Sequence, residues 1–260
     1  MLIYTDEGFV IASDSRGSGG GNSERKLFPT HGLRGTGVYA VSGAASFPDC
    51  GPVDPFIDIY KQTARKLESE TFSDLTGYAN RFSDFVGDEL HRYLRDWRRQ
   101  REEEQVQISK GLKQEQNVVI HFACYFNDKP SMSKRKIYYG GEGERPRGAQ
   151  QEANIVEPYS GQHCYVGSEN VLKSLLRGSP ALEKFYAPAF EKLNNGESVS
   201  MEEAKKIAEN YIEACKSEEG RKIDSSIGES IGGQVAIAVV KPPAGGFEWF
   251  KEPPSFWDRV

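Results

Sequence analysis

The chain has 260 residues, of which 37% are hydrophobic and 27% are charged, and its formal net charge is −5. This composition is ordinary for a globular protein, and the length is enough to bury a sizeable core. The acidic balance disfavours a general nucleic-acid or anionic-membrane partner, and no apolar run approaches the roughly 20 residues that a membrane helix needs.

The start of the sequence carries no basic segment followed by an apolar one, so we expect no secretory signal. The four cysteines are scattered and form no Cys-x-x-Cys pair; they are Cys50, Cys124, Cys164 and Cys215. We expect core thiols rather than disulfides or zinc ligands, which favours a cytoplasmic protein without a metal or cofactor.

The first part of the chain predicts four short strands. The first two flank the polar residues Thr5-Asp6-Glu7 and are therefore expected to form a hairpin. A loop rich in glycine and serine follows over residues 16–25, and a turn of small residues follows the fourth strand. The four strands run over Leu2–Tyr4, Gly8–Ser13, Lys26–Phe28 and Gly37–Ser42.

Two amphipathic helices are expected next. Apolar residues recur at helical spacing from Phe56 to Leu67 and again from Leu75 to Trp97. The second helix runs on into a stretch of arginines and glutamates at 98–104, which we interpret as a solvated, charge-paired extension.

The remaining chain predicts strands, then helices, then a final hairpin. Strands are expected over Asn117–Phe126, Arg135–Tyr139, His163–Val166, Val235–Val240 and Phe247–Phe250, with loops over Asn127–Lys134 and Gly140–Ala153; helices are expected over Asn170–Leu176, Ala181–Asn194 and Ser200–Cys215. Segregated runs of strands and helices indicate an α+β domain rather than alternating βαβ units. No repeat or linker divides the chain, so residues 1–260 are expected to form a single domain.

Asp14 ends an almost wholly apolar strand, and Lys26 begins the next one after a short loop. An aspartate in this place can simply form a turn. An aspartate and a lysine at neighbouring strand ends can also pair and position a proton relay. The residues alone leave both interpretations open.

Four segments, taken in order, resemble the proteasome β-subunit family of N-terminal nucleophile (Ntn) hydrolases. They are GFVIASDSR at 8–16, KLFPTHGLRGTGVYAVSGAAS at 26–46, HCYVGSEN at 163–170 and SIGGQVAIAVV at 230–240. The resemblance runs across nearly the whole chain. It implies a four-layer αββα sandwich, with two antiparallel sheets between helix layers.

The resemblance also implies amide or peptide hydrolysis by an N-terminal Thr, Ser or Cys. The side chain of that residue attacks the carbonyl while its own α-amine, whose ordinary pKa is near 8, takes the proton. By position, Asp14 and Lys26 match the family's catalytic pair, Gly43 matches the turn that stabilises the oxyanion, and Ser168 matches a serine near the nucleophile. Gly17 and Ser18 match the edge along which substrate pairs as an extra strand.

Two features depart from the family pattern. A gapless count places the nucleophile about three residues upstream of Met1, and no Thr, Ser or Cys in the given sequence fills that place. Thr5 falls in the predicted hairpin turn, too far along the strand to serve. Where the family carries an Asp and a Ser before its Gly-Gly, the count gives Gly228 and Ile231, with Asp224 and Ser230 nearby but out of register.

Other candidate sites are weaker. His121 with Cys124 and His163 with Cys164 have spacings that place their side chains on opposite faces of a strand, so we expect core cysteines and satisfied histidines rather than a metal site. The glycines of 17–22 lack the spacing of a phosphate-binding loop. The arginines between 92 and 101 favour a solvated or subunit-facing helix over a nucleic-acid surface.

Two functions follow. The first is a proteasome-type Ntn amidohydrolase or peptidase, acting on a peptide or small amide substrate. The second is a non-catalytic, proteasome-like ring subunit with a structural or regulatory role, in which Asp14 and Lys26 form a structural ion pair. In both cases the resemblance implies self-association in a ring through the helices at 56–67 and 75–97.

Overall fold

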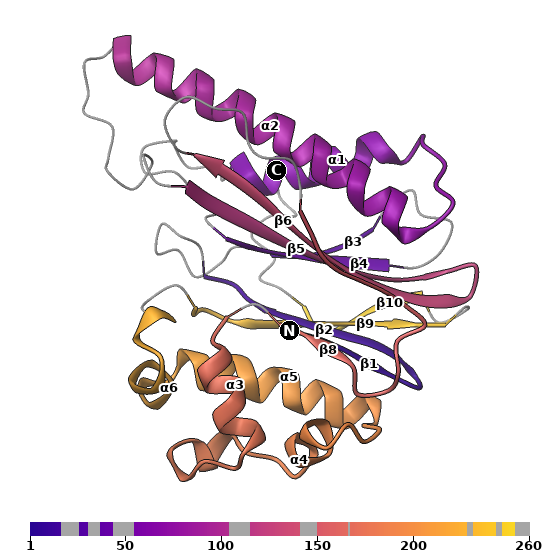
Figure 1. The fold of residues 1–260 in the computed structure, drawn as a ribbon, viewed down its shortest axis with the longest axis vertical. Helices are drawn as coiled ribbons and strands as arrows, with labels where there is room; N and C mark the ends of the chain where they lie inside the picture. The colour runs from indigo at the N-terminus through magenta and orange to yellow at the C-terminus, as the bar shows by residue number, and fades with distance from the viewer. Residues whose placement is uncertain are drawn as a thin grey trace.

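Two five-stranded antiparallel sheets face each other at the centre of the molecule (Figure 1). The computed structural model describes residues 1–16, 26–30, 37–43, 55–103, 115–140, 150–165, 167–227, 231–242 and 246–252. The first sheet has the order β10 (Gly246–Lys251), β9 (Val235–Lys241), β2 (Gly8–Asp14), β1 (Leu2–Thr5) and β8 (His163–Cys164). The second has the order β3 (Leu27–Pro29), β4 (Gly37–Gly43), β5 (Glu115–Phe126), β6 (Lys129–Gly140) and β7 (Gln150–Val156).

Helices cover the outer face of each sheet, which gives four layers (Figure 1). The second sheet is covered by α1 (Pro55–Leu67) and α2 (Leu75–Glu103). The first sheet is covered by α3 (Glu169–Leu176), α4 (Ala189–Asn194), α5 (Met201–Lys216) and α6 (Glu218–Ile223), with 3₁₀ turns at Pro180–Phe185 and Ser225–Ile227. The molecule is therefore a mixed α and β sandwich of two antiparallel sheets. This architecture agrees with the α+β class that the order of strands and helices predicts.

The apolar residues divide into three cores because each strand alternates between two buried faces. On β2, Phe9 and Ile11 point toward the second sheet, whereas Val10 and Ala12 point toward α5. This strand is buried on both sides, which explains its almost continuous apolar run.

Helix α5 is the main support of β2. Ser200 caps its start in a reciprocal capping box with Glu203, and Ala204, Ile207 and Tyr211 are buried toward the first sheet. A serine cap of this kind stabilises a helix by about 1 kcal/mol. The helix carries Tyr211 and Cys215 to the far end of β2, next to Asp14.

The hairpin between β1 and β2 forms as predicted and fixes the register of both strands. Thr5 pairs with Gly8, and its buried hydroxyl donates to the Gly8 carbonyl over 3.0 Å. Gly8 has φ +144°, and a Cβ there would lie 2.3 Å from the Val240 carbonyl oxygen. The turn therefore needs glycine.

Three sequence predictions differ from the structure. Strand β7 lies largely in the segment predicted as loop, and β6 begins at Lys129 rather than Arg135. The helix predicted over Ala181–Asn194 is a 3₁₀ turn followed by the short helix α4. β7 is an edge strand whose polar residues pair with β6, so its sequence lacks the apolar alternation that identifies a half-buried strand.

Helix α2 spans 29 residues, and its amphipathic N-terminal part buries Leu75, Tyr78, Phe82 and Val86 against the second sheet. Among the helices in the described ranges, none is long and apolar enough to cross a membrane.

Candidate active site between the two sheets

Asp14 and Lys26, which come from opposite sheets, meet at one end of the inter-sheet space. The Lys26 Nζ lies 2.9 Å from Asp14 Oδ1, and each side chain is 13% exposed. The second carboxylate oxygen of Asp14 accepts hydrogen bonds from the backbone N–H groups of Arg16 at 3.2 Å and Gly232 at 3.0 Å. The structure therefore contains the ion pair that the strand ends predict, and three donors hold the carboxylate in place.

The start of β1 runs directly beside this pair. Met1 and Ala12 exchange two backbone hydrogen bonds, of 2.7 Å from Met1 N to the Ala12 carbonyl and 2.8 Å in the other direction. Burial lowers the pKa of the Met1 amino group to about 6, an effect that the Asp14 carboxylate partly opposes. An amine held here is thus largely neutral at pH 7 and able to accept a proton.

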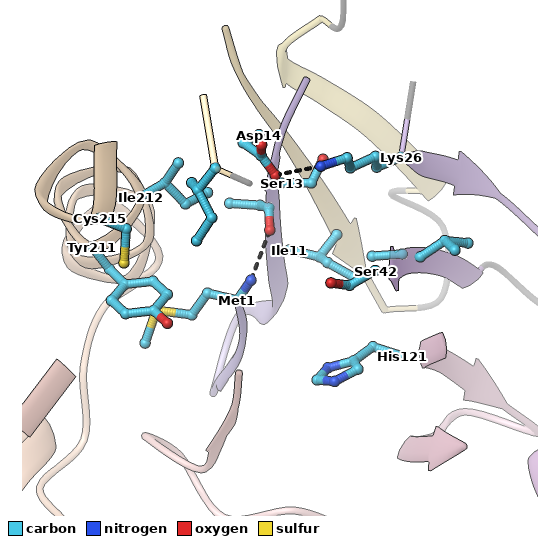
Figure 2. A pocket seen from close by; sticks show the side chains of 14 residues that line it. Met1, Ile11, Ser13, Asp14, Lys26, Ser42, His121, Tyr211, Ile212 and Cys215 are labelled. Carbon is cyan, nitrogen blue, oxygen red and sulfur yellow. Dashed lines mark hydrogen bonds and ion pairs between the residues drawn. The ribbon is translucent and has the colours of Figure 1, made fainter. Parts of the chain in front are cut away.

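A cavity of about 50 Å³ extends from the Asp14–Lys26 pair into the inter-sheet space (Figure 2). Its lining comes from β2, β4 and β5 and from helix α5, together with Met1, Lys26 and Ile231. The lining residues are Met1, Ile11, Ala12, Ser13, Asp14, Lys26, Ala40, Val41, Ser42, His121, Tyr211, Ile212, Cys215 and Ile231. Most of this surface is apolar, so the few polar groups decide what the cavity can bind.

His121 lies at the end of the cavity away from the Asp14–Lys26 pair (Figure 2). Its side chain is buried, and its Nε2 has no hydrogen-bond partner. Burial, reinforced by the positive charges of the Met1 amino group and Lys134, lowers the pKa of His121 to about 3. The expectation of a satisfied core histidine is therefore wrong for this nitrogen, although His163 does share a hydrogen bond with the Gly161 carbonyl.

Ser168 lies outside the cavity lining, at the start of α3. It caps α3 by accepting from the Val171 N–H at 3.0 Å, and it donates to Asp224 Oδ2 at 2.6 Å. Hydrogen bonds from Ser168 and Ser226 lower the pKa of Asp224. Tyr211, which does line the cavity, donates to the Ser168 carbonyl at 3.4 Å. Asp224 is thus the carboxylate that contacts Ser168. The comparison with the family pattern places Asp224 out of register, so the contact is seen only in the folded structure.

The other predicted site residues are placed as follows. Gly43 is the last residue of β4, paired with Val118 and directly after Ser42 of the cavity lining. Gly17 and Ser18 lie outside the described residues. Thr5 lies at the opposite end of β1 from Met1, where its hydroxyl is engaged in the hairpin turn.

The three cysteines in the described ranges give no sign of a metal centre. Cys124 faces the α2 side of the second sheet, whereas His121 faces the cavity, as the strand spacing predicts. Cys124, Cys164 and Cys215 are free thiols. In the described part of the chain, no group of three or more His, Cys, Asp or Glu side chains is arranged to hold a metal ion.

Comparison with known proteins leaves the site without a named counterpart. No family model matches the chain, and neither the curated proteins nor the solved structures gave a significant match.

Proposed function

We propose that this chain is a proteasome-type Ntn amidohydrolase or peptidase, with its nucleophile three positions before Met1. The observation that carries the proposal is the Asp14–Lys26 pair, set at the open end of an inter-sheet cavity beside the start of β1. The four-layer arrangement and the resemblance of the segments at 8–16, 26–46, 163–170 and 230–240 to that family support it.

The strand register indicates where an upstream residue would lie. Leu2 pairs with Ile11 and Met1 with Ala12, so a residue three positions before Met1 would stand opposite Ser15 if the ladder continues. Side chains alternate along a strand, which puts that residue on the face of Leu2 and Ile11, toward the second sheet. Lys26 approaches from that sheet.

Besides the upstream nucleophile and a water, the chemistry uses groups of this arrangement. The hydroxyl or thiol of the nucleophile attacks the substrate carbonyl and gives its proton to the α-amine of the same residue. The leaving amine takes that proton as the C–N bond breaks, and water releases the acyl group from the enzyme. The Lys26 ammonium, held by Asp14, stabilises negative charge near the nucleophile, and by the family resemblance the backbone at Gly43 binds the oxyanion.

The alternative is a non-catalytic ring subunit, and one observation favours it. The Asp14–Lys26 pair joins the two sheets and is only 13% exposed, so it also serves as a structural tie. In that role the pair would stabilise the sandwich without any nucleophile beside it.

The two functions are separated by reading the coding frame upstream of Met1 and labelling the protein made from it. We expect a Thr, Ser or Cys codon about three positions before Met1. We also expect one equivalent of a peptide epoxyketone on that residue once it is N-terminal, as seen by intact mass. A closed frame, or a protein that takes up no label, would refute the hydrolase and leave the ring subunit.

A further inference from the structure

At its His121 end the cavity carries a buried polar atom without a hydrogen-bond partner, His121 Nε2. The half-buried side chain of Ser42 lines the same cavity. Leaving a buried polar group unpaired costs about 1–3 kcal/mol, so an unpaired imidazole nitrogen facing a cavity calls for an explanation.

The register of the second sheet places these two side chains together. His121 of β5 pairs with Ala40 of β4, and Ser42 is two residues further along β4. The two are therefore diagonal neighbours on the same face, with Cβ atoms about 7 Å apart. Such a separation leaves room for one small group to bridge the imidazole and the hydroxyl. Figure 2 shows both side chains on the same side of the cavity, across from Met1.

The size of the cavity also exceeds a single water. A water needs roughly 10–15 Å³ on this measure, and the cavity offers about 50 Å³. The cavity volume is therefore large enough for a group of three or four heavy atoms.

The surroundings select an uncharged group. Lys26 is neutralised by Asp14, and Lys134, which stands opposite His121 on β6, is paired with Glu152 at 2.6 Å. An ion entering this largely apolar space would lose its hydration without meeting a free opposite charge among the described residues. A neutral imidazole nitrogen donates or accepts a hydrogen bond according to its tautomer. A carboxamide can bond to either tautomer because its NH₂ group donates and its oxygen accepts.

We propose that His121 and Ser42 form a binding site for a primary carboxamide group. The group comes either from a glutamine or asparagine side chain of a bound peptide or from a free small amide. This site shares the cavity with Asp14 and Lys26 but uses neither residue, and the carboxamide binding does not rest on the proposed hydrolase activity.

The test uses the ¹⁵N-histidine-labelled chain and follows the imidazole nitrogens by NMR. Acetamide is titrated first, with sodium acetate as the charged probe of equal size. We expect acetamide to shift the His121 Nε2 signal saturably, and acetate to leave it unchanged. His163, whose ring already shares a hydrogen bond with Gly161, is the internal control and should not move.

Two variants secure the assignment. His121→Gln removes the signal and identifies it, and Ser42→Ala keeps the signal but should weaken acetamide binding roughly threefold to tenfold. Ser42 is only half-buried, so its alanine variant is expected to fold.

The source of the carboxamide is decided with N-acetyl-Gly-Gln-Gly-amide and its Glu counterpart. A stronger shift with the Gln peptide than with acetamide assigns the site to peptides, whereas a shift with acetamide alone assigns it to free amides. Acetate binding as tightly as acetamide, or no probe moving the His121 signal, would overturn the proposal. A failed hydrolase would instead show as absent epoxyketone labelling, with acetamide binding intact.

Discussion

At the Asp14 end of the cavity a carboxylate accepts from three donors, whereas at the His121 end a buried imidazole nitrogen has no hydrogen-bond partner. The first arrangement is self-sufficient, and its removal should damage the fold as well as any chemistry. The second is incomplete in itself, and its removal should cost the protein little except binding. The difference separates polar groups that stabilise the fold from polar groups that are available to bind a ligand.

The largest effect is expected from Asp14→Ala. The change removes the acceptor of Lys26 and of the N–H groups of Arg16 and Gly232. The free energy of unfolding should therefore fall by about 3 kcal/mol. Epoxyketone labelling of the full-frame protein should fall about 100-fold. Urea unfolding and labelling rates measure the two effects.

The matched control is Glu157→Gln, which breaks the exposed ion pair between Lys129 and Glu157. Both of its side chains are more than half exposed, so the midpoint of unfolding should not move measurably. Equal losses for Asp14→Ala and Glu157→Gln would contradict the distinction between the two pairs.

The pH dependence of stability should report His121. Its pKa is about 3 in the folded protein and near 6.5 when unfolded, so the unfolded chain binds the proton first as the pH falls. Between pH 6.5 and about pH 4.5 the wild type should therefore lose about 2 kcal/mol more stability than His121→Leu. Parallel pH profiles for the two proteins would show that His121 is not buried as a neutral group.

Two serine-to-alanine changes compare a hydroxyl that both donates and accepts a hydrogen bond, that of Ser168, with the half-buried hydroxyl of Ser42 in the cavity lining. Ser168→Ala removes the α3 cap and the contact with Asp224, and should cost about 1.5 kcal/mol. Ser42→Ala should change stability by less than about 0.5 kcal/mol. Chemical unfolding of both variants tests the pair, and a larger loss for Ser42→Ala would mean that its hydroxyl is engaged in the unliganded protein.

The smallest effect is a gain. His121→Leu exchanges an unpaired buried polar side chain for an apolar one of similar size, so stability at pH 7 should rise by about 1 kcal/mol. The same variant should lose acetamide protection in a thermal shift assay. A destabilised His121→Leu protein would indicate that the imidazole is already satisfied.

The sequence predicts the Asp14 end of the cavity better than the His121 end, for a physical reason. The two apolar strands and their polar ends are local patterns, so the placement of Asp14 beside Lys26 follows from strand order and a short loop. The diagonal placement of His121 and Ser42 depends on the register between β4 and β5, which are separated by more than 70 residues, and no local pattern encodes it. The contact of Ser168 with Asp224 is hidden for the same reason, because it depends on how the chain folds back after α6.

The most direct test of the central claim is the site of epoxyketone modification in protein made from the full reading frame. Peptide mapping should find the label once, on a Thr, Ser or Cys three positions before Met1, and Asp14→Asn should slow the labelling about 100-fold. Label on an internal side chain such as Ser42 or Cys215, or labelling that survives Asp14→Asn unchanged, would contradict the account.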